Sequence, residues 1–394
     1  MVYLYPRYRI LMIDIRYPED IPLKKFLSLT LLVLVLLQYI PASAAESDSS
    51  LTLSAECAAL YDAENRRPLY EKNATACHAM ASTTKIMTAL IALEALPLDT
   101  KVVVPAEATG IEGSSVYLKK GEVYTLEALL YALLLQSAND AAEVIAYAVA
   151  GSVPAFAQLM NEKVAALGLT NTHFDNPHGL DSEQHYTTAS DLAIIACAAL
   201  ENPDFYKIVS SRRYTFCGVN GENPRMLINH NKLLYLYDGT VGVKTGFTKK
   251  CGRCLVSAAE RDGLLLVAVT LDAPSDWSDH AKLLDYGFSR LERRVIAKTG
   301  TLSLSLPLLN TDGEVTVTNS EDITLIMERD SPTPHPVLDI LPHPTLPIKK
   351  GALAGSITYT SEDGITVTSP LIYTEDIPLK KSQKGWFGIG RKAQ

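Results

Sequence analysis

The hydrophobic pattern of this chain changes type once, near Arg294, and that change most constrains its fold. Before Arg294, segments with apolar residues at helical spacing are mixed with strand-like runs. After it, the apolar segments are short and alternate with polar residues, and turn sequences such as residues 310–313 separate them. We therefore expect a mixed α/β domain followed by a small all-β domain.

The first part carries both helix and strand signals. We expect strands at residues 53–61 and 68–70, joined as a hairpin, and further strands at 239–247, 254–260 and 264–271. Residues 264–270 are nearly all apolar, as in a central strand. Helices are expected from Ser82 onward and at residues 126–135, 140–150, 154–167, 191–200 and 277–291.

The second part contains only strand signals. Short alternating segments occur at residues 302–306, 314–318, 323–327, 355–359 and 365–368. Residues 332–347 are proline-rich, so we expect a loop there. We interpret this part as a β-sandwich. The expected organisation is an N-terminal extension with a signal peptide at 1–44, a mixed domain at 50–293, a β-sandwich at 294–379 and a basic aromatic tail at 380–394.

The N-terminal segment is typical of an export signal. A positive pair, Lys24 and Lys25, precedes the uncharged and mostly apolar residues 26–40, and small residues at 42–44 follow Pro41. The apolar run is shorter than the roughly 20 residues needed to span a bilayer. We therefore expect a cleaved signal peptide and an extracytoplasmic protein, associated with the cell wall or the membrane, rather than an uncut anchor.

Charge limits the partners of the protein. The net charge of −8 argues against a nucleic acid, or an anionic membrane, bound through the body of the chain. The tail holds basic and aromatic residues, which suit a helix lying on a membrane. Its glycines weaken such a helix, so we slightly favour a disordered basic tail and keep peripheral membrane contact as the alternative.

The six cysteines give little support for a metal site. Cys251 and Cys254 form a C-x-x-C sequence, but no second C-x-x-C or H-x-x-H sequence accompanies it. Cys197 lies in an apolar run and is expected to be a buried helix residue. Export would permit disulfides without showing any. We expect no metal and no cofactor.

Ser82 and Lys85 form an S-x-x-K sequence at an expected helix start. Residues three apart share a helix face, so the hydroxyl and the amine come within reach of each other. A serine hydroxyl needs a base to become a nucleophile, and a lysine can serve if its pKa is lowered. The pair taken alone favours a helix-capping serine and a solvated lysine.

Two further short sequences follow in order, and together with the first they favour a catalytic role for Ser82 and Lys85. Ser137 and Asn139 form an S-x-N after the expected helix 126–135; the hydroxyl could pass a proton and the amide could hold a substrate carbonyl. A loop cap is the alternative for them. Lys244, Thr245 and Gly246 form a K-T-G in an expected strand: the lysine adds positive charge, the threonine can bind a carboxylate, and the glycine lets a peptide lie along the strand.

A second K-T-G begins at Lys298. It lies at the expected domain boundary and lacks the preceding Val-Gly-Val sequence. We do not expect it to be catalytic.

The ordered S-x-x-K, S-x-N and K-T-G resemble the penicillin-binding protein and β-lactamase superfamily. Sequences around residues 81–90, 133–142, 178–189, 229–234 and 241–248 narrow the resemblance to the low-molecular-mass penicillin-binding proteins, serine-type D-alanyl-D-alanine carboxypeptidases. The resemblance covers nearly the whole chain after the signal segment. It implies a transpeptidase-like α/β (α+β) domain with an antiparallel sheet flanked by helices, removal of the terminal D-alanine from peptidoglycan stem pentapeptides, and inhibition by β-lactam antibiotics.

The resemblance also implies roles for individual residues. Ser82 would be the acylated nucleophile, Lys85 its base and Ser137 a proton relay. Asn139 would position substrate, Lys244 with Thr245 would bind the terminal carboxylate of the substrate, and Gly246 would let the substrate backbone lie against the strand. The backbone N–H groups of Ser82 and Phe247 would form the oxyanion hole.

The chain departs from its relatives at three places. Met80 stands where relatives often have proline, and Cys251 stands where an alanine is common. Some relatives hold the substrate carboxylate with an arginine in the loop before the closing helix, but residues 273–280 contain none. How the carboxylate is bound therefore stays open. The histidines His178, His185 and His230 are interpreted as structural.

Three alternatives remain open for the reaction. A class A β-lactamase is disfavoured because no glutamate in an E-x-x-L-N context lies between Asn139 and Lys244. A D,D-endopeptidase that cuts crosslinks is closer and stays possible. A non-catalytic wall-binding protein is disfavoured, because a protein that only binds the wall would not need Ser82, Lys85, Ser137 and Lys244 together.

Overall fold

A computed structural model describes residues 51–222, 224–308, 313–341 and 346–378. The expected signal peptide at 1–44 and the basic tail at 380–394 lie outside these residues. In the described part of the chain, no single helix is long and apolar enough to cross a membrane; α4 (Asn139–Ala150) and α5 (Val153–Ala166) pass such a test only together, across an 82° bend.

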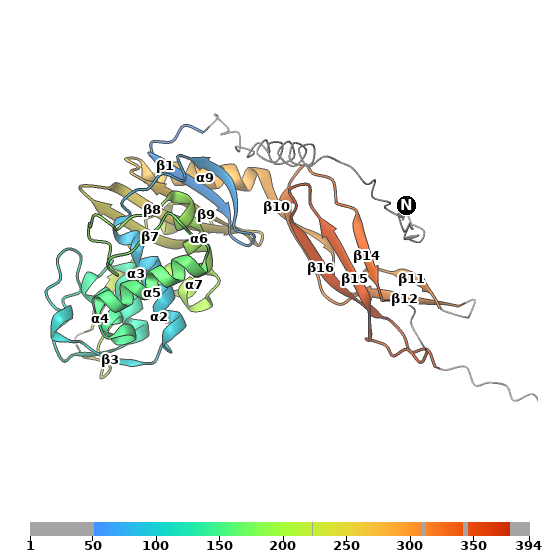
Figure 1. Ribbon diagram of the computed structural model, residues 1–394, viewed down its shortest axis with the longest axis horizontal. Helices are drawn as coiled ribbons and strands as arrows, with labels where there is room; N and C mark the ends of the chain where they lie inside the picture. Colours follow the sequence, from blue (N-terminus) through green and yellow to red (C-terminus); the bar gives the residue numbers. More distant parts are fainter. Residues whose placement is uncertain (1–50, 223, 309–312, 342–345, 379–394) are drawn as a thin grey trace, which may run out of the picture. The chain divides into compact units, whose positions relative to one another are not determined.

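The first sheet is antiparallel and has the strand order β2-β1-β9-β8-β7 (Figure 1). β7 therefore lies at one edge. The expected hairpin and the three later strands are confirmed, with bounds shifted by a few residues. The strands are β1 (Cys57–Asp62), β2 (Arg67–Lys72), β7 (Thr240–Thr248), β8 (Gly252–Arg261) and β9 (Leu264–Leu271).

Each face of this sheet is covered by helices. In β1, Cys57 and Ala59 belong to a large core shared with the helices that carry the site, whereas Ala58 and Leu60 belong to a second core that includes residues of α9. This alternation is the period of a strand buried on both faces. The expected antiparallel sheet flanked by helices is confirmed.

The helices follow the expected order. The longer ones besides α4 and α5 are α2 (Lys85–Ala95), α3 (Leu126–Leu135), α6 (Ala189–Leu200), α7 (Pro203–Ser210) and α9 (Asp276–Arg290). α7 was not expected from the sequence, although Asn202 caps it through hydrogen bonds to the N–H groups of Asp204 and Phe205, and Pro203 begins it. Short elements complete this part: η1 (Ala81–Thr84), η2 (Ala106–Ala108), α8 (Leu233–Leu236), and the hairpins β3 (Lys101–Val103) with β4 (Val123–Thr125) and β5 (Arg213–Phe216) with β6 (Arg225–Ile228).

The C-terminal part contains two sheets. One has the order β11-β12-β16-β15-β14, and the other pairs β10 with β13. Side chains from both sheets, among them Ala297, Ile323 and Val317, share one apolar core, so the expected β-sandwich is confirmed. The strands are β10 (Leu291–Ala297), β11 (Leu304–Pro307), β12 (Glu314–Asn319), β13 (Ile323–Glu328), β14 (Pro336–Ile340), β15 (Leu353–Thr360) and β16 (Thr366–Tyr373).

Two expectations for this part need comment. The loop expected at 332–347 was wrong in part, because β14 lies within it and pairs with β15; β14 is an edge strand, where proline is tolerated. The domain boundary expected at 293/294 falls inside β10, which pairs with β13 along its length. The domain limits themselves stay a prediction.

Candidate active site

Ser82 lies in the short helix η1, which leads directly into α2. The backbone before it is tightly held. Ala81 has a φ of +47°, and a side chain on Gly179 would come within 1.9 Å of the Ala81 carbonyl oxygen. Thr84 Oγ1 donates to that same oxygen at 2.7 Å. These contacts fix the turn that presents the Ser82 hydroxyl.

His185 completes this support. Its Nδ1 accepts from the Asp175 N–H at 3.0 Å, so its Nε2 carries the hydrogen that is donated to Thr84 Oγ1 at 2.8 Å. Burial lowers the pKa of His185 to about 4. A neutral, fully bonded imidazole agrees with the structural role expected for this residue.

Lys85 occupies the first turn of α2 and is fully buried. Its Nζ donates to Ser82 Oγ at 3.0 Å, to Asn139 Oδ1 at 2.7 Å and to the His178 carbonyl oxygen. The amide and carbonyl oxygens can only accept and use two N–H donors, whereas the Ser82 hydroxyl accepts from a protonated Lys85 and can donate to the lone pair of a neutral one. The amine is therefore held in one place beside the serine hydroxyl.

The pKa of Lys85 lies well below its usual value. Burial is the largest cause, and the positive charge of Lys244 adds to it, while Asp140 acts in the opposite direction. Burial also lowers the pKa of Lys244 to about 7. Both causes of the lowered pKa favour the neutral form of Lys85, and only a neutral amine can accept the proton of a serine hydroxyl.

Ser137 and Asn139 connect α3 to α4. Ser137 has a φ of +61°, and its side chain lines the cavity described below. The Asn139 N–H donates to the Ser114 carbonyl oxygen at 2.7 Å, and Asn139 Nδ2 donates to that of Glu112 at 2.6 Å. Because Oδ1 accepts from Lys85, the side-chain amide is fully oriented by its partners.

The K-T-G residues lie on β7, beside η1. A side chain on Gly246 would come within 3.1 Å of the Met80 carbonyl oxygen and 3.2 Å of the Ser82 nitrogen, so glycine permits this close approach. Lys244 is buried, and its Nζ donates to the Thr245 carbonyl oxygen at 2.8 Å. Phe247 is exposed beyond them.

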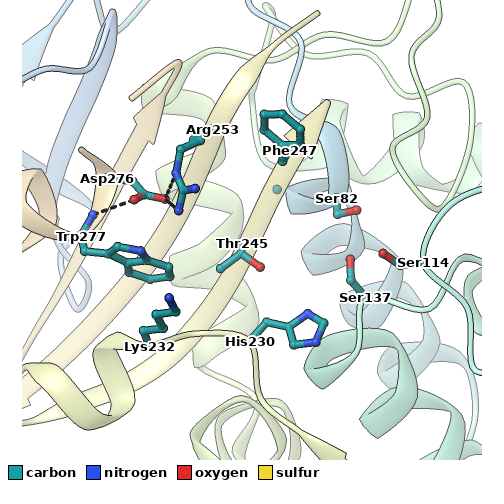
Figure 2. Close-up of a pocket in the computed structure, with 11 residues that line it drawn as sticks. Ser82, Ser114, Ser137, His230, Lys232, Thr245, Phe247, Arg253, Asp276 and Trp277 are labelled. Carbon is teal, nitrogen blue, oxygen red and sulfur yellow. Dashed lines mark hydrogen bonds and ion pairs between the residues drawn. The ribbon is translucent and has the colours of Figure 1, made fainter. Parts of the chain in front are cut away.

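A cavity of about 370 Å³ lies between these groups. Figure 2 shows Thr245 near its centre, with Ser82, Ser114 and Ser137 on one side and Arg253, Asp276 and Trp277 on the other. Lys85, Asn139 and Lys244 are buried behind the lining. The residues that line the cavity are Ser82, Ser114, Ser137, His230, Lys232, Thr245, Gly246, Phe247, Arg253, Asp276 and Trp277.

The structure thus brings all eight sequence-derived site residues into one region. Sequence reasoning missed five lining residues that come from different parts of the chain: Ser114 and Lys232 from loops, Arg253 from β8, and Asp276 and Trp277 from the start of α9. Only the register of β8 against β7, which pairs Arg253 with Phe247, reveals the arginine. The second K-T-G lies elsewhere, in the turn after β10, where Thr299 binds Asp322.

The remaining expectations can now be compared with the structure. The ring of His178 accepts from the Leu180 N–H and lies near Glu143, and only its carbonyl contacts Lys85. His230 lines the cavity. Cys197 is buried in α6, as expected. The sulfur atoms of Cys251 and Cys254 lie 3.9 Å apart, and all six cysteines, which lie in the described part, are free thiols.

Comparison with known proteins gives a consistent result. A family model described as D-alanyl-D-alanine carboxypeptidase matches residues 43–275. The chain is 30% identical to the D-alanyl-D-alanine carboxypeptidase DacF of Bacillus subtilis over 386 residues, which cover 92% of this chain and 99% of that protein. It is 37% identical to DacB2 of Mycobacterium tuberculosis over 236 residues, 58% of this chain and 80% of that one.

A solved structure extends this likeness to the fold. The Streptococcus pneumoniae protein PBP3, described as a peptidoglycan synthesis regulatory factor, aligns with a TM-score of 0.70 and 25% identity. The alignment covers 83% of this chain and 100% of that one. The similarity therefore includes much of the β-sandwich as well as the mixed domain.

Proposed function

This chain belongs to the family of D-alanyl-D-alanine carboxypeptidases, and from that premise we propose how its own residues carry out the reaction. It is a serine-type D,D-carboxypeptidase, a penicillin-binding hydrolase that acts on peptidoglycan peptides and binds β-lactams. The observation that carries the residue assignment is the contact of 3.0 Å between Lys85 Nζ and Ser82 Oγ. The pKa of Lys85, lowered by burial, supports its role as base.

In the acylation step, Ser82 Oγ attacks the carbonyl carbon of the penultimate D-alanine. Lys85, in its neutral form, takes the hydroxyl proton as the new C–O bond forms. The backbone N–H groups of Ser82 and Phe247 stabilise the negative charge on the carbonyl oxygen, a contribution of about 3 kcal/mol in related chemistry. The close packing of Gly246 on Ser82 supports this pairing of donors from η1 and β7.

In the second half of acylation, the C–N bond breaks. The proton on Lys85 passes through the Ser137 hydroxyl to the leaving amine, and D-alanine departs.

In the deacylation step, a water molecule attacks the ester carbon of the acyl-enzyme. The shortened peptide leaves, and a proton of the water returns to Ser82 Oγ. Asn139 orients both Lys85 and the substrate carbonyl, and Thr245 binds the substrate end from β7.

Intact-mass measurement after treatment with penicillin tests this assignment. We expect one covalent adduct on Ser82, and no adduct in the Ser82→Ala variant. Absence of the adduct in the unaltered protein, or its persistence in the variant, would contradict the assignment of Ser82 as the nucleophile. Ser210→Ala provides a matched control, because Ser210 lies at the end of α7, outside the cavity lining.

A second assay separates carboxypeptidase from endopeptidase action. The enzyme is given a stem pentapeptide and, separately, a crosslinked dimer, and the release of free D-alanine is compared with cleavage of the crosslink. We expect D-alanine release to dominate. The same purified enzyme, incubated with excess penicillin, shows slow release of the adduct if it is not a β-lactamase.

Export and membrane contact are further parts of the proposal. The positively charged and then apolar sequence of residues 1–44 supports a cleaved signal peptide and an extracytoplasmic site of action. A role in cell shape would follow from action on the wall, and the basic and aromatic residues of the tail support peripheral membrane contact as the alternative to a disordered tail. N-terminal sequencing of the exported protein and vesicle binding with and without residues 380–394 test these points.

A further inference from the structure

The substrate of a carboxypeptidase ends in a carboxylate, and the site must provide a cation for it. The cavity and the residues behind it offer Lys85, Lys244, Lys232 and Arg253. The loop at 273–280, before α9, contains no arginine. Lys85 and Lys244 are buried, and Lys232 and Arg253 line the cavity; of these last two, Arg253 is held in place by a carboxylate, that of Asp276, and offers paired donors that match a carboxylate.

The two buried lysines are poorly suited. Lys85 is bonded to three acceptors, one of them the nucleophile. Lys244 is 1% exposed, donates to a backbone carbonyl and is absent from the cavity lining. Burial lowers its pKa to about 7, so it is only partly charged at neutral pH. A guanidinium stays charged throughout this range.

Arg253 lies on β8, directly opposite Phe247 of β7, and lines the cavity. Its Nε and Nη2 both lie 3.0 Å from one oxygen, Oδ2, of Asp276. A guanidinium has five N–H donors, so this single oxygen leaves others for a ligand. Both residues line the cavity, but the side chain of Arg253 is 45% exposed and that of Asp276 only 5%, so the arginine is the more accessible of the two to a ligand.

Asp276 is itself fixed. Its other oxygen, Oδ1, accepts from the Trp277 N–H at 2.9 Å, and its own N–H donates to the Ala273 carbonyl oxygen at 3.1 Å. The Asp276 carboxylate, fixed at the start of α9, therefore determines the orientation of the Arg253 guanidinium. Figure 2 shows Arg253 and Trp277 on the same side of Thr245, across the strand from Ser82. A peptide whose reactive carbonyl lies at Ser82 would extend its terminus over Thr245 toward this group.

We propose that Arg253, positioned by Asp276, binds the terminal carboxylate of the substrate together with Thr245. The inference rests on the proposed function and deepens it. It assigns the recognition of a free carboxyl terminus to β8 instead of the loop before α9. Charge-assisted hydrogen bonds from a guanidinium to a carboxylate are among the stronger polar contacts in proteins.

The test compares two peptides that end in D-alanyl-D-alanine, one with a free terminal carboxylate and one with a terminal amide. The measured quantity is the ratio of kcat/KM for the acid to kcat/KM for the amide. We expect Arg253→Gln to reduce this ratio about 10- to 100-fold. Arg253→Lys keeps the positive charge but loses the planar, paired N–H donors of the guanidinium, so it should reduce the acid-to-amide ratio less than Arg253→Gln does.

Lys250→Leu is the matched control, because Lys250 is an exposed cation in the turn between β7 and β8, outside the cavity lining. It should leave the ratio unchanged. If the unaltered enzyme releases no D-alanine, the proposed function fails. If it prefers the acid and Arg253→Gln keeps that preference, the inference is overturned while the function stands. Because Arg253 is nearly half exposed, we expect the variants to fold; a melting curve and the penicillin adduct check this.

Discussion

Asn139 Oδ1 accepts a hydrogen bond of 2.7 Å from Lys85 Nζ, and this contact ties the second sequence motif to the first. The two residues lie on different helices, α4 and α2. The amide directs the lysine toward Ser82, and the lysine in turn fixes the amide next to the cavity. The base and the group that holds the substrate are therefore oriented by the same bond.

Replacing Lys85 should remove most of the acylation rate. We expect both Lys85→Ala and Lys85→Arg to slow the reaction of Ser82 with penicillin by about 10²- to 10⁴-fold, the usual contribution of a general base. Arginine retains positive charge but does not give up its proton in this pH range. Stopped-flow acylation rates test this, and a Lys85→Arg variant with near-normal rates would exclude Lys85 as the base.

The pH dependence of acylation should respond to Lys244. The neutral form of Lys85 is the active one, so the rate falls as pH falls through the pKa of Lys85. Removing the positive charge of Lys244, the second cause of the lowered pKa, raises the pKa of Lys85. In Lys244→Met the acidic limb of the pH–rate profile should therefore move to higher pH. The midpoint of that limb is the readout, whatever the height of the plateau; an unmoved midpoint contradicts the coupling.

Gly246 should tolerate no side chain. Because a Cβ there would lie 3.1–3.2 Å from Met80, Ala81 and Ser82 atoms, Gly246→Val must push β7 away from η1. We expect a loss of about 100-fold in acylation rate, the size seen when an oxyanion donor is lost.

Gly300, in the second K-T-G, is the matched control for Gly246. A Cβ there meets no atom within 4 Å, although its φ of +73° disfavours a side chain. Gly300→Ala should cost about 1 kcal/mol of unfolding free energy and leave acylation unchanged. Equal effects of the two variants on acylation would argue against the assigned role of Gly246.

The cysteines should differ in their reactivity toward an alkylating reagent. Cys77 is exposed, whereas Cys57, Cys197, Cys251 and Cys254 are buried. Although its contact with Cys254 lowers the pKa of the Cys251 thiol, the burial of Cys251 limits the access of a reagent. We expect iodoacetamide to modify Cys77 first, as measured by peptide mapping at short times. Early modification of Cys251 would mean that the turn after β7 opens readily.

Much of the fold could be predicted where length and composition indicate one kind of element. Residues 126–135 and 264–271 are both nearly all apolar and match α3 and β9, because leucine and alanine favour the helix in the first and the short length with valine and threonine favours the strand in the second. The strand β14 was missed because the prolines of residues 332–347 indicated a loop, whereas Pro336 is tolerated as the first residue of an edge strand. The domain boundary expected at 293/294 stays a prediction, and the pairing of β10 with β13 across it joins segments far apart in the sequence, which no local pattern reveals.

The residues of the site could likewise be predicted only where a local sequence pattern contains them. Ser82, Lys85, Ser137, Asn139 and the K-T-G could be found because each belongs to a short local sequence whose spacing carries chemistry. Arg253 could not, because its neighbours, Phe247 and Asp276, come from a strand pairing and a helix start. The sequence Cys251-Gly-Arg-Cys254 drew attention to its thiols, and only the register of two strands points to the arginine between them.

The edge position of β7 has a consequence for drug resistance. A peptide or a β-lactam that adds along this edge is recognised largely by main-chain groups, and those groups are the same for every residue type. Apart from a substitution by proline, which removes an N–H, a point mutation changes the side chain and leaves the main-chain donors and acceptors in place. A variant that resists β-lactams but still cleaves peptides should therefore carry its substitution where side chains distinguish a peptide from a β-lactam. The end of the cavity near Arg253, where the peptide terminus is proposed to bind, is the place to look for such substitutions.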